Sequence, residues 1–334
     1  MTIKDLAKQT GYSVGTVSRV LNNHPNVSPK ARAAIEQAIA ESGFERNINA
    51  CQLKQTRASS ILVLVKGTGN ELFREMVEII QARLSQTPYS PIADYIPDNG
   101  NEVRRAIALI REKKPLGILF LGGTQEHFLA DFGKISIPCV LVTGDGTDLG
   151  FPNLSSIRTD DREAAFAAVS TLIALGHRHI AMIGGDPTGS GAPRLRWEGF
   201  RQALERHGLP SGPELCRSAA FTRQEGYEAA LDLLSSGQKF TALFAAADVL
   251  AIGAIRALRD RGLRVPEDVS VIGMDGLPLG EYLVPRLATV AQSTRPMAQR
   301  SVELLLDAIE NAAAARHETL PFTVLDRESI RAAE

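Results

Sequence analysis

The stretch GYSVGTVSRVLNN, residues 11–23, combines hydroxyl side chains, small side chains and a single arginine. These groups suit a DNA duplex. Thr16 and Ser18 carry hydroxyls that donate to phosphate oxygens, and Arg19 is long enough to donate to O6 and N7 of guanine. Val14 provides an apolar contact for a thymine methyl group. An ordinary helical hairpin, with the hydroxyls acting only as helix caps, is the alternative interpretation.

Three short helices are expected around this stretch. Thr2 caps a first helix, which Gly11 ends. Ser13 caps a second helix with Val17 on its inward face, so that the neighbouring small residues point outward. A third helix follows in the run NVSPKARAAIEQAIAESGF. Two helices joined by a turn that contains glycine, with a third helix behind them, fit a helix-turn-helix unit.

The charge of the chain is unevenly distributed. Residues 1–60 contain eight basic and four acidic side chains, a formal charge of +4, whereas the remainder of the chain sums to -5. A basic N-terminal segment before an acidic body favours a polyanion as the partner of that segment.

Composition also predicts the compartment. The first ten residues, MTIKDLAKQT, carry charges where a signal peptide needs an apolar core, and no run approaches the roughly 18 apolar residues of a membrane span. Cys51, Cys139 and Cys216 lie far apart and lack metal-ligand spacing. We therefore expect a reduced, cytoplasmic protein without disulfides, metal sites or membrane contact.

Residues 44–60, FERNINACQLKQTRASS, are expected to form a short amphipathic helix followed by a polar linker. Leu53 has little to pack against within so short a helix. We expect it to contact its equivalent in a second chain and to wedge into the minor groove. Docking of Leu53 on the body of the same chain is the alternative.

Beyond residue 60, short apolar runs alternate with amphipathic helical patterns such as ELFREMVEIIQARL. The runs are ILVLV (61–65), GILFL (117–121), PCVLV (138–142), HIAMIG (179–184), TALFA (241–245) and VSVIG (269–273). This alternation predicts βαβ units and parallel sheets. Because there are too many strands for one small sheet, we expect two lobes with a ligand cleft at the carboxyl ends of the strands.

The N-terminal segment, from TIKDLAKQTGYSVGTVSRVLNN to AIAESGF, resembles the headpiece of the LacI/GalR family of bacterial transcription regulators, and NINACQL resembles the hinge helix of that family. The resemblance implies that Val14, Gly15 and Arg19 contact bases and that Leu53 intercalates at the operator centre. The residues expected at the DNA are Thr2, Ser13, Val14, Gly15, Thr16, Ser18, Arg19, Asn22, Leu53 and Lys54.

Four body segments resemble the effector-binding core of the same family, which has a two-lobed, periplasmic-binding-protein-like fold. They are SIRTDDREAAFAAVSTLIALGHRHIAMIGG, RLRWEGFRQAL, VPEDVSVIGMDG and LDRESIRAA. On their own, these body segments would equally suit an exported sugar-binding protein.

The resemblance and the chemistry of the side chains agree on six candidate effector residues. Arg196 and Asp275 can hold neighbouring sugar hydroxyls by charge-assisted hydrogen bonds. Phe73 and Phe221 either stack on the ligand or belong to the core, and Asp160 either touches the ligand or caps a helix. The full set is Phe73, Asp160, Arg196, Phe221, Asp248 and Asp275. The family commonly has Asn-Asp where this chain has Ala247-Asp248, so the identity of the effector stays open.

Enzyme interpretations find less support. The glycine-rich GGDPTGSG (184–191) lacks both the Gly-x-Gly-x-x-Gly spacing and the Gly-Lys-Ser/Thr ending of phosphate loops, and no nucleophile-elbow sequence is present. We expect no catalytic residue and no cofactor. A nucleotide- or sugar-using α/β enzyme and a stand-alone sugar-binding protein are the alternatives.

The combined prediction is an α/β protein with an all-α headpiece, a repressor that binds a near-palindromic operator as a homodimer under control of a small-molecule effector, expected to be a sugar. The predicted divisions are residues 1–46 for the headpiece, 47–60 for the hinge helix and linker, and 61–334 for effector binding and dimerisation. The chain shows no leucine-heptad tail, so a dimer is expected rather than a coiled-coil tetramer.

Overall fold

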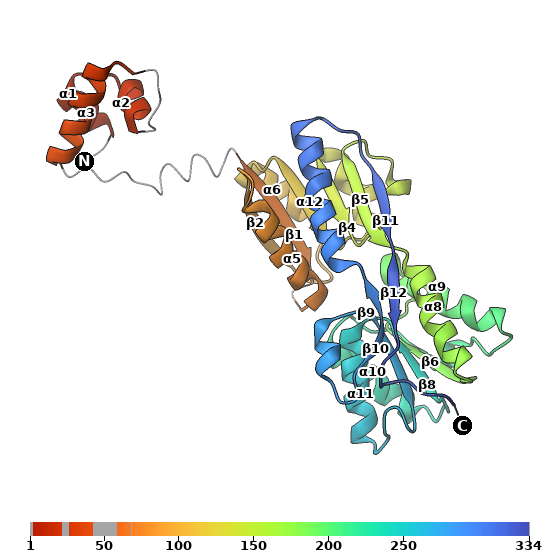
Figure 1. Ribbon diagram of the computed structural model, residues 1–334. Helices are drawn as coiled ribbons and strands as arrows, with labels where there is room; N and C mark the ends of the chain where they lie inside the picture. Colours follow the sequence, from red (N-terminus) through yellow and green to blue (C-terminus); the bar gives the residue numbers. More distant parts are fainter. Residues whose placement is uncertain (1–2, 22–26, 43–58, 68, 334) are drawn as a thin grey trace. The chain divides into compact units, whose positions relative to one another are not determined.

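The computed structural model describes residues 3–21, 27–42, 59–67 and 69–333. The chain divides into two compact units, Met1–Gln55 and Thr56–Glu334 (Figure 1). The finer division expected from the sequence, with a hinge at residues 47–60, falls largely outside the described residues and stays a prediction.

The first unit contains three helices, α1 (Ile3–Thr10), α2 (Val14–Leu21) and α3 (Pro29–Ser42). Leu6, Val17 and Ile35 come from the three helices in turn and are completely buried against one another. Gly11 has a φ of +72° in the turn between α1 and α2, a conformation that glycine adopts without a steric penalty. The predicted helix-turn-helix unit is confirmed.

The second unit has two lobes, each built on a six-stranded sheet. The N lobe comprises residues 59–159 and 294–320, and its strand order is β11-β5-β4-β3-β1-β2 with every pair parallel. The strands are β1 (Ser60–Lys66), β2 (Ser90–Ile96), β3 (Gly117–Leu121), β4 (Cys139–Val142), β5 (Leu154–Thr159) and β11 (His317–Leu320). The helices are α5 (Glu71–Leu84), α6 (Glu102–Lys113), α7 (Gln125–Asp131) and α12 (Thr294–Glu310).

The C lobe comprises residues 160–293 and 322–333, with the strand order β12-β10-β9-β8-β6-β7. Its strands are β6 (Ile180–Ile183), β7 (Cys216–Arg217), β8 (Ala242–Ala245), β9 (Ser270–Asp275), β10 (Ala288–Gln292) and β12 (Phe322–Leu325). Its helices are α8 (Asp161–Ala174), α9 (Gly191–Arg206), α10 (Arg223–Ser235) and α11 (Asp248–Asp260). All pairs are parallel except β10 with β12, which is antiparallel.

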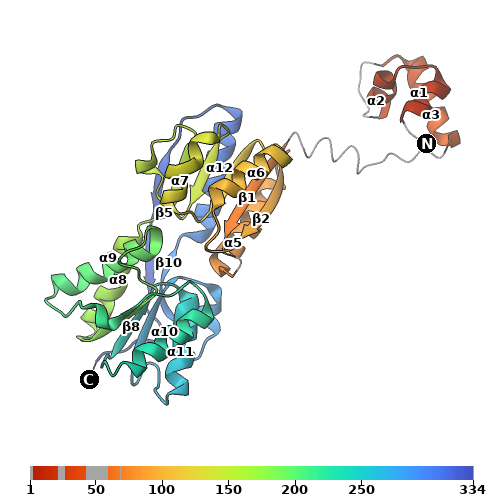
Figure 2. The ribbon, with the colours of Figure 1, turned by 180° about the vertical axis from the view of Figure 1, so that it is seen from behind.

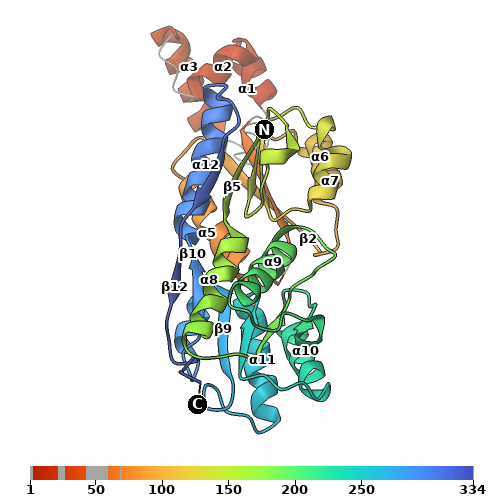
Figure 3. The same cartoon turned by 90° about the vertical axis from the view of Figure 1, so that its right-hand side faces the viewer.

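Helices cover both faces of each sheet, which explains why the strands read as continuous apolar runs rather than as alternating patterns. In β1, Ile61 and Val63 pack toward α5 and α12, whereas Leu62 and Leu64 pack toward α6 and α7. Figure 2 shows α6 and α7 on their face of the N lobe. In the C lobe, α8 and α9 lie on one side and α10 and α11 on the other (Figure 3).

The chain passes between the lobes three times, after β5, after β10 and between β11 and β12. The last passage is one residue long, so β11 runs almost directly into β12 from one sheet to the other (Figure 1). Each of the six apolar runs predicted as strands lies on an observed strand, and the two-lobed α/β prediction is confirmed. Among the described residues, no helix has the length and apolar character needed to cross a membrane.

Close packing of α8 on α9 depends on Gly199. A methyl group added there would lie 2.1 Å from the backbone oxygen of Arg162. We predict that Gly199→Ala lowers the free energy of unfolding by about 1–3 kcal/mol, because the two helices must separate to admit the methyl group. Urea unfolding measures the loss.

Gly133→Ala is the matched control, because no atom lies within 4 Å of the added methyl position. Its free energy of unfolding should stay within about 0.5 kcal/mol of the wild-type value. Equal effects of the two substitutions would contradict the role given to the α8–α9 contact.

Candidate nucleic-acid interface and ligand cleft

The second helix of the first unit, α2, begins with a side-chain cap. The Thr16 backbone N–H donates to the Ser13 hydroxyl over 3.1 Å, and the Val17 N–H donates to the Ser13 carbonyl over 3.0 Å. The hydroxyls of Ser13 and Thr16 lie 2.9 Å apart and share a hydrogen bond. The capping role of Ser13 is therefore seen directly, and it leaves the hydroxyls at the exposed start of the helix.

The outward face of α2 has the composition expected from the sequence. Val14 is 43% exposed, Gly15 and Arg19 are exposed, and Val17 and Val20 are buried. An exposed valine beside a glycine and an arginine lets the helix backbone approach a duplex while one long donor reaches farther. The Thr2, Asn22, Leu53 and Lys54 predictions lie outside the described residues.

A cleft of about 700 Å³ lies in the second unit, lined by segments of both lobes. Its N-lobe side comes from the residues that follow β1, β3, β4 and β5, and its C-lobe side includes the ends of β9 and β10. The volume falls within the range typical of small-molecule sites, and its position at the carboxyl ends of parallel strands is the usual one for α/β proteins. Five of the six predicted effector residues line it: Phe73, Asp160, Arg196, Phe221 and Asp275.

Arg196, on α9, is the central cation of the cleft. It is only 4% exposed, and its Nε lies 2.8 Å from Asp161 while Nη1 lies 3.3 Å from Asp275. Nη1 also donates to the Ala246 carbonyl, and the guanidinium lies 5.4 Å from the centre of the Phe221 ring. The arginine is thus held in one orientation by two carboxylates, a carbonyl and an aromatic face.

Asp275 ends β9 with an unusual backbone. Its φ is +119°, and Gly276 follows with a φ of +74°. A side chain at position 276 would lie 2.5 Å from the Cβ of Ala291, so glycine is required there. The turn directs the Asp275 carboxylate to Arg196 and to Gln292, whose amide donates to it over 2.8 Å.

Asp248 is placed differently from our expectation. It lies outside the cleft lining and is completely buried at the start of α11. Its carboxylate accepts from the Thr289 hydroxyl over 2.6 Å and from the Leu277 N–H over 2.7 Å. Burial, followed by the charge of Asp275, raises the pKa of Asp248 to about 8. The expectation that this carboxylate faces a ligand is corrected: it braces the segment after β9 from behind.

Asp160, Phe73 and Phe221 each have a structural role and also line the cleft. Asp160 caps α8 by accepting from the N–H groups of Arg162 and Glu163, both over 3.2 Å, and still borders the cleft. Phe73 is largely buried on α5 and Phe221 is half-buried, so each packs on the core and forms part of the cleft wall.

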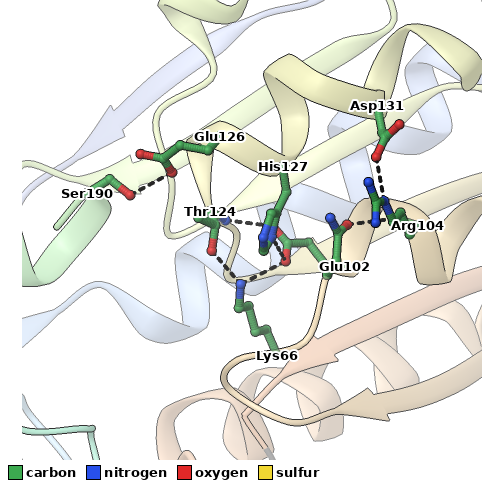
Figure 4. A network of polar contacts seen from close by, with 9 residues as sticks. Lys66, Glu102, Arg104, Thr124, Glu126, His127, Asp131 and Ser190 are labelled. Atoms are coloured by element: carbon green, nitrogen blue, oxygen red, sulfur yellow. Dashed lines mark hydrogen bonds and ion pairs between the residues drawn. The ribbon is translucent and has the colours of Figure 1, made fainter.

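Sequence reasoning missed a polar network on the N-lobe side of the cleft, shown in Figure 4. Glu102 is 1% exposed and accepts from Lys66 over 2.8 Å, from the Thr124 N–H over 2.6 Å and from His127 Nδ1 over 3.0 Å. Burial opposes ionisation of Glu102, but these hydrogen bonds outweigh it and hold its pKa below the usual range. Lys66 and Thr124 line the cleft.

The positions of these residues in the sequence, near strand ends and at a helix start, could have indicated this network. Lys66 is the last residue of β1, Thr124 follows β3 within three residues, and Glu102 opens the helix after β2. Parallel strands bring such residues to one edge of a sheet. Asp161, also missed, stands beside the predicted Asp160.

Among the described residues, two polar contacts between side chains join the N lobe to the C lobe. The Ser190 hydroxyl donates to Glu126 of α7 over 2.8 Å (Figure 4), and Arg223 pairs with Glu71. Both link the start of an N-lobe helix to the C lobe, so the two lobes meet in the described conformation.

A helix-turn-helix unit joined to a two-lobed ligand-binding body defines a ligand-responsive DNA-binding regulator. Residues 2–47 match the family of bacterial regulatory proteins described as lacI, and residues 169–330 match a periplasmic binding protein-like domain. The chain is 34% identical to the HTH-type transcriptional regulator MalR of Clostridium butyricum, covering 98% of this chain and 99% of that protein. The protein belongs to the LacI family of bacterial transcriptional regulators.

Other relatives agree with this family. The HTH-type transcriptional repressor PurR of Pasteurella multocida is 32% identical over 94% of both chains. The lac repressor dimer bound to operator and the anti-inducer ONPF superimposes with a TM-score of 0.78, at 27% identity and 99% coverage of both chains. A complex of the regulator CelR with cellobiose gives a TM-score of 0.71, at 29% identity, covering 98% of this chain and 99% of that one.

A LacI family regulator from Enterococcus faecium with bound ribose gives a TM-score of 0.72 at 26% identity, covering 83% of this chain and all of the other. The curated relatives named here are transcriptional regulators rather than enzymes.

Burial of Asp248 predicts a pH-dependent stability. Its pKa is about 8 in the folded chain, compared with 3.8 as the ordinary value, so the folded state holds an extra proton between about pH 4 and pH 8. The free energy of unfolding therefore falls as the pH rises through this window, with a slope from this group of at most about 1.4 kcal/mol per pH unit.

Asp248→Asn should remove that component of the slope between pH 6.5 and pH 8, while the exposed Asp326→Asn should keep it. Urea unfolding at a series of pH values measures the slope. A wild-type slope in the Asp248→Asn variant would show that the Asp248 carboxylate does not titrate in this window.

Proposed function

We propose that the protein represses transcription by binding a near-palindromic operator as a homodimer in the cytoplasm, under control of a sugar bound in the cleft. The observation that carries the proposal is the presence, in one chain, of a helix-turn-helix unit whose α2 exposes Val14, Gly15 and Arg19 and of a cleft of about 700 Å³ between two lobes.

The DNA-binding part rests on the exposed side chains of α2. Val14 and Gly15 let the helix lie close to base edges, Arg19 donates to a guanine, and Ser13, Thr16 and Ser18 provide hydroxyls at the phosphates. Thr2 and Asn22 extend these phosphate contacts, and Leu53 and Lys54 act at the minor groove at the operator centre.

A sugar effector is supported by the chemistry of the cleft wall. Asp161 and Asp275 fix the orientation of Arg196, so a ligand hydroxyl meets donors and acceptors that are already in place. Phe73 and Phe221 supply apolar surface for the face of a sugar ring. Cellobiose and ribose are bound by the two similar regulators named above.

Regulation follows from the position of the cleft between the lobes. A ligand that contacts both lobes favours one degree of closure, and the chain enters the N lobe directly after the hinge segment. Closure thereby alters the spacing of the two hinges in a dimer. Such coupling between two sites is typically worth about 1–3 kcal/mol.

The homodimer is supported by apolar side chains that a monomer would leave in water. Tyr282 and Val284 are each 83% exposed, and Leu279 is close to them in sequence and also exposed. Clustered exposed apolar residues mark an interface, and a two-fold dimer matches two half-sites of a palindrome.

Selection of bound sequences from random duplex DNA tests the whole proposal. We expect the full-length protein to enrich a near-palindromic motif, and one sugar of a panel to reduce its recovery. Absence of an enriched motif under every condition would exclude sequence-specific DNA binding, and a motif insensitive to all sugars, with no sugar bound in calorimetry, would exclude a sugar effector.

Arg19 supplies the prediction for base recognition. Arg19→Ala should weaken operator binding by about 1–3 kcal/mol per half-site contact and relax the preference at one base position in each half-site. Titration of the enriched motif and of its single-base variants measures both effects. The charge-matched control Arg111→Ala, at an exposed position of α6, should bind like the wild type. Unchanged base preference in the Arg19→Ala variant would remove Arg19 from base recognition.

Tyr282 supplies the prediction for assembly. Tyr282→Asp places a charge in the proposed interface and should convert the protein to monomers in sedimentation velocity experiments, with at least tenfold weaker binding to the palindrome. Leu129→Asp, at an apolar residue of α7 that is 59% exposed, is the control and should sediment as the wild type. A dimeric Tyr282→Asp variant would place the interface elsewhere.

A further inference from the structure

The cations of the cleft are all engaged by carboxylates. The described lining contains five cationic side chains, and each forms an ion pair. The pairs are Lys66 with Glu102, Arg158 with Asp145, Arg162 and Arg194 with Glu198, and Arg196 with both Asp161 and Asp275. A ligand therefore meets no unpaired cation among the described lining residues.

Two of these carboxylates, Glu102 and Glu198, lie outside the lining themselves. Glu102 is the more buried of the two. Its carboxylate accepts hydrogen bonds from Lys66, from the Thr124 N–H and from His127 (Figure 4). Because removal of Lys66 would leave a buried carboxylate without its cation, the pair strongly resists being opened by a competing anion. Hydrogen bonds from all three partners keep the pKa of Glu102 low, so it stays ionised at neutral pH.

Glu198 performs the same task in the C lobe. It stands on α9 between two arginines, with Arg194 Nε at 2.8 Å from one oxygen and Arg162 Nε at 3.1 Å from the other. One carboxylate thus accepts hydrogen bonds from two guanidinium groups of the cleft lining. Without Glu198, these two positive charges would lack this carboxylate partner.

We propose that the cleft selects electrically neutral, polyhydroxylated ligands, and that Glu102 and Glu198 determine this selectivity by neutralising Lys66, Arg162 and Arg194 from outside the lining. The proposal rests on the function proposed above, in which this cleft holds the effector. It assigns a specificity role to two residues that do not touch the ligand.

An anionic ligand would need to break these pairs or to accept the repulsion of the lining carboxylates. Six aspartates line the cleft, Asp98, Asp145, Asp148, Asp160, Asp161 and Asp275. A neutral hydroxyl, in contrast, donates to a carboxylate and accepts from its paired cation at once, so it adds to an ion pair without disrupting it. Phosphate esters and sugar acids are excluded on this basis.

Cationic ligands gain little either. Asp145, Asp161 and Asp275 already have arginine partners, Asp160 caps α8, and Asp98 and Asp148 are exposed to water. Water screens an exposed carboxylate, so it attracts an amine only weakly.

The test measures binding of ribose 5-phosphate, inorganic phosphate, ribose and glucosamine to the full-length protein by calorimetry. We expect Glu102→Gln to raise the affinity for ribose 5-phosphate at least tenfold over the wild type, because it leaves Lys66 with an unneutralised charge. Glu198→Gln, at a more exposed position, should also raise the affinity for ribose 5-phosphate. This variant provides the test if the Glu102→Gln variant does not fold.

Asp131→Asn is the matched control, because it also removes an N-lobe carboxylate that is paired with cations, Arg104 and Lys134, but none of these lines the cleft. Its affinity for ribose 5-phosphate should stay within twofold of the wild type. The double variant Glu102→Gln with Lys66→Met should lose the gained affinity, which assigns the gain to Lys66.

The proposal is overturned if wild-type protein binds ribose 5-phosphate or glucosamine more tightly than ribose, or if neither glutamate variant gains affinity for the phosphate compounds. These measurements require no DNA. Failure of operator selection with the expected phosphate results would therefore refute the regulatory function and leave the selectivity of the cleft standing, and the reverse result would refute only the selectivity.

Discussion

Organisation of the cleft depends on the ion pairs of Arg196, which join three elements that are distant in sequence. The guanidinium comes from α9, Asp161 starts α8, and Asp275 ends β9. Burying the arginine without these carboxylates would strongly destabilise the folded state. The ion pairs therefore require α8, α9 and the end of β9 to lie together. The positive φ of Asp275, the glycine after it and the buried Asp248 behind it all serve to bring one carboxylate to this position.

Both lobes neutralise cations of the cleft lining with a glutamate. In each lobe a glutamate on a helix pairs with cations of the cleft lining: Glu102 of α6 pairs with Lys66 in the N lobe, and Glu198 of α9 pairs with Arg162 and Arg194 in the C lobe. These three cations line the cleft, whereas the two glutamates lie outside its lining. This arrangement holds the lining cations in fixed orientations on both sides of the cleft before any ligand arrives.

The sequence predicted the elements of this protein better than the partners of its polar residues. Strands such as β3 and helices such as α5 follow from local apolar patterns, which the tertiary structure does not override. The family resemblance and side-chain chemistry together predict Arg196 and Asp275, whereas neither predicts Glu102. Its partners lie 36 and 22 residues away, at Lys66 and Thr124, and no local pattern reports which strand ends become neighbours. The prediction that Asp248 lines the cleft is wrong for the same reason. No local pattern shows that its carboxylate lies behind the segment after β9 and accepts from the Leu277 N–H.

The passage from β11 to β12 near the end of the chain has a consequence for biosynthesis. The N-lobe sheet takes its edge strand from residues 317–320 and the C-lobe sheet takes its own from residues 322–325, so neither sheet is complete until these residues, which follow all the other strands in sequence, have been translated. The three helices of the first unit, in contrast, form their core from residues of α1, α2 and α3, which all precede β1 in sequence. On the ribosome the first unit therefore has its whole core long before either sheet has its edge strand, and the two lobes fold after it.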